Sequence, residues 1–184
     1  MGWLALGVLL ALVLFWAVGA YNRLMRLRGE VLRQWGTVDT VWVKWLVRFQ
    51  GAVSARQILA WASEADDLQA LQNGSDALIE ALAEARQQSL DDVSLQKLLT
   101  RHEALMNCID AVALRVPDTV RPHLLSAQST LLQNIPLALL SYHAAVEAYN
   151  QALAQAPTRW LAKGCRLRQA LHLPWQARNA GTAV

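Results

Sequence analysis

The sequence predicts an all-α protein in which an N-terminal transmembrane helix is followed by an antiparallel helical bundle. An uncharged apolar run opens the chain, and apolar residues recur at helical spacing through the rest of it. No stretch alternates apolar and polar residues for long enough to predict a strand. The predicted organisation is a transmembrane anchor over residues 1–21, one bundle over residues 22–173 and a flexible tail over residues 174–184.

The predicted anchor runs from Gly2 to Ala20 without a charged residue. As a helix it spans about 28 Å, because each residue adds about 1.5 Å, and this length matches the hydrocarbon core of a bilayer. A cleaved signal peptide is the alternative interpretation. That interpretation is disfavoured because no charge precedes the run and because helical spacing continues after it.

The orientation follows from basic residues on one side of the predicted anchor. Arg23, Arg26, Arg28 and Arg33 follow the apolar run, whereas only the amino terminus precedes it. Flanking Lys and Arg are enriched on the cytoplasmic side of membranes. We therefore expect the bundle on the cytoplasmic side.

Charge is distributed in three blocks behind the net charge of +3. Residues 21–56 carry seven basic and two acidic residues, residues 57–118 carry four basic and eleven acidic residues, and residues 119–184 carry six basic and one acidic residue. Two explanations stay open. Oppositely charged helices could lie side by side in the bundle, or the basic ends could contact lipid headgroups, where each Lys or Arg contributes about 1 kcal/mol.

Two apolar seams dominate the helical periodicity, with steps that alternate between three and four residues after one step of seven from Leu24 to Val31. Each seam is expected to pack on a partner helix; the two seams are natural partners for each other, and other pairings also fit the sequence. The first consists of Leu24, Val31, Trp35, Val38, Trp42, Trp45 and Phe49, and the second of Leu132, Ile135, Leu139, Tyr142, Val146, Tyr149 and Leu153.

Shorter helices are expected between and after the seams. Asn73 and Gly74 predict the end of one helix, because both residues favour helix C-termini. Ser94 and Thr119 are candidate N-caps for the two helices that follow. A last helix is expected from Thr158 to about residue 173.

No enzyme site, metal site or cofactor site is predicted. The glycines are scattered, no nucleophile elbow occurs, and no Glu-x-x-His pair is present. His102 is interpreted as a core histidine, and His143 with Glu147 as a surface pair on one helix face. Cys108 and Cys165 lack a metal-binding spacing and are expected to be free, partly buried thiols. Neither a nucleic-acid partner nor a cofactor is expected.

Two sets of residues are candidate interaction surfaces. Trp35, Trp42 and Trp45 are interpreted mainly as core packing, with an exposed docking strip for a partner helix as the alternative. The predicted last helix is amphipathic and carries both basic and apolar residues. We interpret its apolar residues mainly as packing on the bundle, and contact of the helix with a membrane surface is the alternative. The candidate lipid contacts are Arg159, Trp160, Lys163, Arg166 and Arg168.

Two strings of residues carry a resemblance to a known family. The anchor runs into Tyr21 and Asn22, followed by Leu24, Leu27, Arg28, Val31, Trp35, Val38 and Asp39. The string from Tyr142 to Asn150, followed by Pro157, Leu161 and Ala162, is the second. Together these strings resemble the opening and the paired-tyrosine helix of LemA family proteins, as a divergent member.

The resemblance implies a membrane-bound antiparallel bundle of bacterial type, with no established enzymatic activity and no cofactor. It implies single-pass attachment to the bacterial inner (cytoplasmic) membrane. We therefore expect a non-enzymatic scaffold or adaptor whose partners are the lipid bilayer and another membrane protein. A membrane-shaping or lipid-binding role of the basic C-terminal helix is the alternative.

Overall fold

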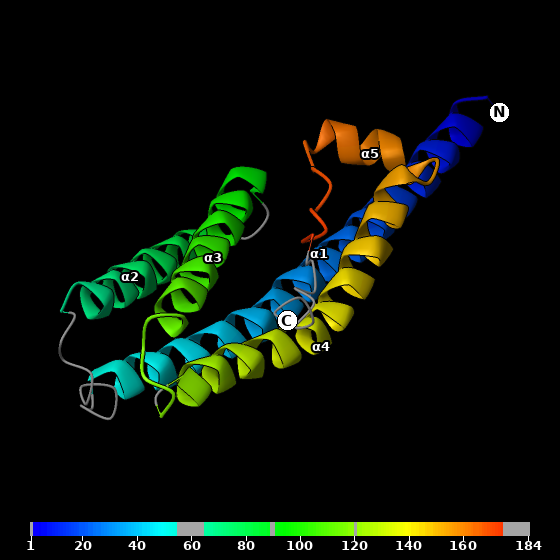
Figure 1. Cartoon of the computed structure of the whole chain (residues 1–184). Helices are drawn as coiled ribbons and strands as arrows, with labels where there is room; N and C mark the ends of the chain where they lie inside the picture. Colours follow the sequence, from blue (N-terminus) through cyan, green and yellow to red (C-terminus); the bar gives the residue numbers. More distant parts are fainter. Residues whose placement is uncertain (1, 55–64, 89–90, 120, 175–184) are drawn as a thin grey trace.

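The chain folds into helices throughout the part that can be described. A computed structural model describes residues 2–54, 65–88, 91–119 and 121–174, and within these ranges it contains five helices and no strand (Figure 1). The predicted all-α class is therefore confirmed. The helices are α1 (Gly2–Ser54), α2 (Ala65–Gln87), α3 (Asp92–Ala113), α4 (Arg121–Ala154) and α5 (Thr158–Gly164).

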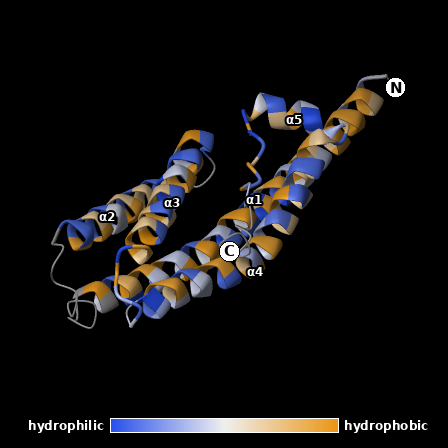
Figure 2. Ribbon diagram, viewed as in Figure 1, coloured by the Kyte–Doolittle hydropathy of each residue, from blue (hydrophilic) through white to orange (hydrophobic). Residues whose placement is uncertain are grey.

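Helix α1 is continuous but has two halves in different surroundings. Its first half projects beyond the other helices, and its large apolar side chains are exposed from Trp3 to Val18 (Figure 2). Its second half is buried along one side from Leu24 to Val53. Among the described residues, α1 is the helix that is long and apolar enough to cross a membrane.

Helices α1 and α4 form the main antiparallel pair. The rings of Trp35 and Tyr142 lie 5.8 Å apart, and ten residues further along α1 the Trp45 Nε1 donates a hydrogen bond of 2.7 Å to the Ala127 carbonyl. All residues of the first predicted seam are buried, and so are those of the second seam except the half-buried Leu132. The predicted partnership of the two seams is confirmed.

Helices α2 and α3 form a hairpin that covers one side of the pair. The ring of Trp42 on α1 lies 6.0 Å from the ring of His102 on α3, which is buried as predicted. Gln50 donates to the Asp76 carboxylate at 3.1 Å, which ties α1 to α2. The opposite side of the α1–α4 pair is not covered by this hairpin (Figure 1).

The predicted helix end at Asn73 and Gly74 is wrong, because α2 continues through both residues. Asn73 accepts a hydrogen bond of 2.8 Å from Gln69 one turn earlier, so its side chain is satisfied within the helix. Gly74 faces α3, and a Cβ at this position would lie 3.0 Å from Cδ1 of Leu105. The glycine therefore permits close approach of two helices and does not end one.

The N-terminus of α3 lies earlier than the candidate cap at Ser94. Asp91 is the N-cap, and its carboxylate accepts a hydrogen bond of 3.1 Å from the Ser94 backbone N–H. Ser94 itself is buried inside the first turn. Helix α4 begins at Arg121, so Pro122 lies in the first turn, where a missing N–H costs little.

The last predicted helix is shorter than expected. Helix α5 ends at Gly164, Arg166 has a φ of 54°, and residues 167–174 continue without helical structure. Ala170 and Leu173 are nevertheless buried, because this segment folds back onto the bundle. The predicted tail includes the exposed Pro174, and residues 175–184 lie outside the described residues.

Candidate functional site

The tryptophan stripe belongs to the core and not to an exposed strip. The exposed fractions are 3% for Trp35, 0% for Trp42 and 6% for Trp45, which confirms the core interpretation. Trp35 and Trp42 are shielded because the tyrosine seam of α4 and the hairpin approach them from two sides. The alternative interpretation, an exposed docking strip made of all three rings, is therefore wrong. Only the edge of Trp45 reaches a surface depression.

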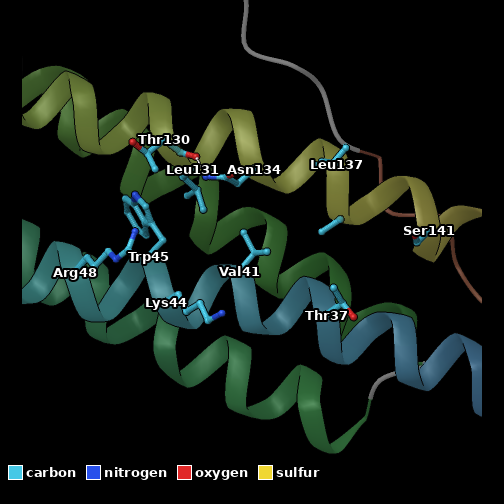
Figure 3. Close-up of a pocket in the computed structure, with 11 residues that line it drawn as sticks. Thr37, Val41, Lys44, Trp45, Arg48, Thr130, Leu131, Asn134, Leu137 and Ser141 are labelled. Atoms are coloured by element: carbon cyan, nitrogen blue, oxygen red, sulfur yellow. Dashed lines mark hydrogen bonds between the residues drawn. The ribbon is translucent and has the colours of Figure 1, made fainter.

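That depression is an apolar groove between α1 and α4, with a volume of about 450 Å³ (Figure 3). We call it the α1–α4 groove. Its floor includes Trp45 and Leu131, and Trp45 is held in place by stacking on Phe49 at 4.9 Å and by its hydrogen bond to Ala127. The lining comprises Thr37, Val41, Lys44, Trp45 and Arg48 of α1 with Thr130, Leu131, Asn134, Leu137, Ala138 and Ser141 of α4.

Two cations of α1 border the groove one helical turn apart. Lys44 and Arg48 are exposed, and neither forms an ion pair with the described residues. On the opposite rim, Leu137 is 70% exposed although it is apolar. The groove thus combines an apolar floor, an exposed leucine and uncompensated positive charge.

The ion pairs between helices explain why these cations remain uncompensated. The acidic segment pairs mainly with itself, since Glu84 of α2 binds Lys97 of α3 and Asp67 of α2 binds Arg115. The ion pair between α1 and α2 uses the aspartate of α1, because Arg86 binds Asp39 at 2.9 Å. The basic α1 does lie beside the acidic α2, as one explanation of the charge blocks expected, but the ion pair between Asp39 and Arg86 joins a minority charge of each segment.

The candidate lipid contacts lie at the other end of the bundle. Arg159, Trp160 and Lys163 are exposed on α5, and Trp160 is 64% exposed. Arg166 and Arg168 are also exposed but follow the end of α5, so the five residues do not share one helix. The predicted basic amphipathic helix over residues 158–173 is thus corrected to a seven-residue helix with a non-helical continuation.

Polar side chains of α4 hold this continuation against the bundle. The Asn150 amide donates to the Ala170 carbonyl and accepts from the Ala170 N–H, both at 2.9 Å, so it satisfies both groups of one residue. The Tyr142 hydroxyl donates to the Leu171 carbonyl at 2.9 Å. Burial, with a contribution from Asp92, raises the pKa of Tyr142 to about 12. The hydroxyl therefore remains a donor even at the alkaline pH at which an ordinary tyrosine ionises.

The predicted surface pair of His143 and Glu147 is not seen as a direct contact among the described residues, and His172 instead approaches both side chains. The His172 ring lies 5.4 Å from that of His143, and its Nε2 lies 3.4 Å from the Glu147 carboxylate. Burial lowers the pKa of His143, and the neighbouring His172 lowers it further. Among the described residues, no group of three or more His, Cys, Asp or Glu side chains is placed to hold a metal ion.

The two cysteines are free thiols, as predicted, but the predicted partial burial holds for Cys108 and is wrong for Cys165. Cys108 is half-buried, and burial raises the pKa of its thiol, while Cys165 is exposed directly after α5. Sequence reasoning missed the α1–α4 groove. The available signal was Leu137, an apolar residue of α4 that lies outside the buried seam.

By its structure the protein belongs to the class of helical bundles, and it is built on one long helix whose N-terminal end is apolar and exposed. Comparisons with protein families, curated proteins and solved structures give no match to this chain.

Proposed function

We propose that this protein is a membrane-anchored, non-enzymatic scaffold or adaptor that presents the α1–α4 groove to another membrane protein. The observation that carries the proposal is the continuity of α1 from Gly2 to Ser54. Its exposed apolar half suits a bilayer, and its buried half forms the bundle and one wall of the groove. One rigid helix would therefore hold the groove at a fixed distance from the membrane.

The proposed occupant of the groove is an amphipathic helix of a membrane-protein partner, with acidic residues beside its apolar stripe. The apolar floor suits such a stripe, as in other helix-in-groove complexes. Lys44 and Arg48 favour acidic side chains, because neither has an ion-pair partner among the described residues. At about 1.5 Å per residue, the groove would begin about 25 Å from the end of the span.

The proposed location is the bacterial inner membrane, with one span and the bundle in the cytoplasm, as the divergent LemA resemblance implies. The arginines after the span support this orientation through the preference of Lys and Arg for the cytoplasmic side. A second candidate function is binding to a lipid surface. The exposure of Trp160 beside basic residues favours it.

Anchoring is tested by alkaline carbonate extraction of the full-length protein from membranes. A retained anchor predicts that the intact chain stays in the pellet and that its N-terminal residues are present by mass spectrometry. Release of the protein into the supernatant, or loss of the first 20 residues, would contradict anchoring and leave a signal peptide or a soluble protein.

Docking is tested by placing a photo-crosslinking amino acid at position 137 in the full-length protein in its native membrane. Leu140 is the matched control, since it is equally exposed on α4 but does not line the groove. A discrete adduct from position 137, absent from position 140 and lost in a Lys44→Glu, Arg48→Glu variant, is expected. The same adduct from both positions, or no adduct, would contradict docking in the groove.

A further inference from the structure

Helix α5 lies at the end of the bundle from which the apolar half of α1 emerges (Figure 1). It contacts α1, and it follows α4 after a short turn. Tyr142 is opposite Trp35, so the antiparallel register places Ala154, at the end of α4, level with about Arg23 of α1. Helix α5 thus begins at the height where the span ends.

Contacts on the span itself agree with this placement. Between Gly2 and Tyr21 the half-buried residues are Ala17 and Ala20, and the other side chains are exposed. Both alanines lie in the last turns of the apolar run, so the bundle reaches the border of the span but does not cover it.

Positive charge gathers at this height without a compensating acid. Residues 21–28 and 155–168 contain seven basic residues and no Asp or Glu. All seven are exposed, and none forms an ion pair with the described residues. We call this set the basic collar, and it consists of Arg23, Arg26, Arg28, Arg159, Lys163, Arg166 and Arg168.

An exposed indole accompanies the basic collar. Ala162 is the buried residue of α5, and its packing on the bundle leaves Trp160 on the outer side. Tyr21, at the end of the span, is also exposed. Trp and Tyr are enriched at membrane interfaces, because their rings are apolar while their N–H and O–H groups can remain hydrated.

We propose that the basic collar and Trp160 bind the headgroups of anionic lipids where α1 leaves the bilayer. This inference rests on the proposed anchoring of α1 and adds a second, lateral contact between bundle and membrane. Uncompensated cations attract an anionic leaflet, and Trp160 would insert at headgroup level. The contact would fix the tilt of the bundle and thereby the direction in which the α1–α4 groove faces.

The test uses the full-length protein in nanodiscs and the native Cys165 as the reporter site. With Cys108 replaced by Ser, an environment-sensitive dye on Cys165 reports the position of the segment that follows α5. The nanodiscs contain phosphatidylcholine with or without phosphatidylglycerol, and a small fraction of lipid carries a quencher on its headgroup. Strong quenching is expected with phosphatidylglycerol at low salt, and severalfold weaker quenching at high salt, because salt screens surface charges.

Matched variants separate headgroup binding from general charge effects. Arg159→Gln with Lys163→Gln should reduce the quenching severalfold, whereas Arg159→Lys with Lys163→Arg should preserve it. Lys97→Gln with Arg101→Gln removes the same charge from α3, outside both the basic collar and the α1–α4 groove, and should leave the quenching unchanged. Circular dichroism checks that each variant retains its helices.

The outcomes distinguish this inference from the anchoring on which it rests. Quenching that needs anionic lipid and the two cations of α5 supports the basic collar. If the protein enters nanodiscs but the quenching is absent, or is equal with both lipids, the basic collar is overturned and anchoring stands. If the protein does not enter nanodiscs at all, anchoring itself is overturned, and the basic collar with it.

Discussion

Replacing Asn150 by Ala should release residues 167–173 from the bundle. The Asn150 amide forms two hydrogen bonds of 2.9 Å with the backbone N–H and carbonyl of Ala170. Ala170 is buried, so water does not readily replace these bonds. Because this segment follows directly on α5, its release would also loosen the position of α5.

The size of the expected destabilisation follows from the backbone N–H and carbonyl of Ala170, which both lose their hydrogen-bond partner. A buried backbone group without a hydrogen bond costs about 1 to 3 kcal/mol. Since the segment can open and regain water, we expect a loss of about 2 to 3 kcal/mol in the free energy of local opening. This corresponds to roughly 30- to 150-fold faster amide exchange over residues 167–173.

Hydrogen exchange measured by mass spectrometry on the full-length protein checks this expectation. Asn134→Ala is the matched control, because the Asn134 amide donates only to the Thr130 carbonyl within the exposed face of α4. It should leave exchange over residues 167–173 unchanged. Equal exchange of this segment in the wild type and in the Asn150 variant would refute the role assigned to Asn150.

Three further substitutions test the packing and titration of the bundle by urea unfolding. Gly74→Ala should lower the free energy of unfolding by about 1 kcal/mol, because the steric cost of the new Cβ against Leu105 exceeds the gain in helix propensity. A stabilised variant would contradict this. Pro136→Ala should raise it by about 1 to 3 kcal/mol, because a backbone hydrogen bond inside α4 is restored; no gain would show that α4 is adapted to the proline. Burial and the neighbouring His172 lower the pKa of His143 below its ordinary value of 6.5. As the pH drops below 6.5, the unfolded chain is protonated at this histidine before the folded protein is, so the free energy of unfolding falls. His143→Gln should reduce that fall, and an unchanged dependence of stability on pH would contradict this.

The helical seams could be predicted from the sequence because their spacing has one physical explanation. Apolar residues that recur every three or four positions over more than twenty residues form a stripe on a helix, and a stripe of that length requires a partner. Two such long stripes are natural partners for each other, although the sequence also allowed other pairings. Trp35 beside Tyr142 confirms the pairing, and Trp45 beside Ala127 shows that it is antiparallel.

The helix ends could be predicted less well because they depend on tertiary contacts. Gly74 is typical of a helix end in isolation, but here it lies against α3, where a Cβ would lie 3.0 Å from Cδ1 of Leu105. Likewise, residues 165–173 have helical periodicity, yet Asn150 and Tyr142 bind this segment in a non-helical conformation. In each case a contact from a distant part of the chain decides between two locally acceptable structures.

The α1–α4 groove could not be predicted because a seam specifies which residues are buried and not how wide the space beside them remains. Lys44 and Arg48 belong to a basic segment in the sequence, and Leu137 is a single exposed leucine. Only the crossing of α1 and α4 brings them to the two rims of one depression. The width of that depression depends on how closely the two helices approach.

The continuity of α1 leads to a last prediction, since one helix would have to transmit the orientation of the span to the bundle. Gly29 is exposed between the span and most of the seam, with open space around it. Gly29→Pro removes a helix hydrogen bond and disfavours helical geometry at Arg28, at a cost of about 3 kcal/mol to straight helix. The bundle should stay folded, because the seam from Val31 onward is intact, but its tilt against the membrane should vary.

Site-directed spin labels in the span and on α4 would measure this as a broader distance distribution in the Gly29→Pro variant than in the wild type. Gly36→Ala is the control, since Gly36 is equally exposed on α1 and alanine favours the helix. An equally narrow distribution for the proline variant would mean that contacts at the basic collar, and not the rigidity of α1, hold the bundle in place. The comparison therefore separates the two ways in which this fold can fix a groove relative to a bilayer.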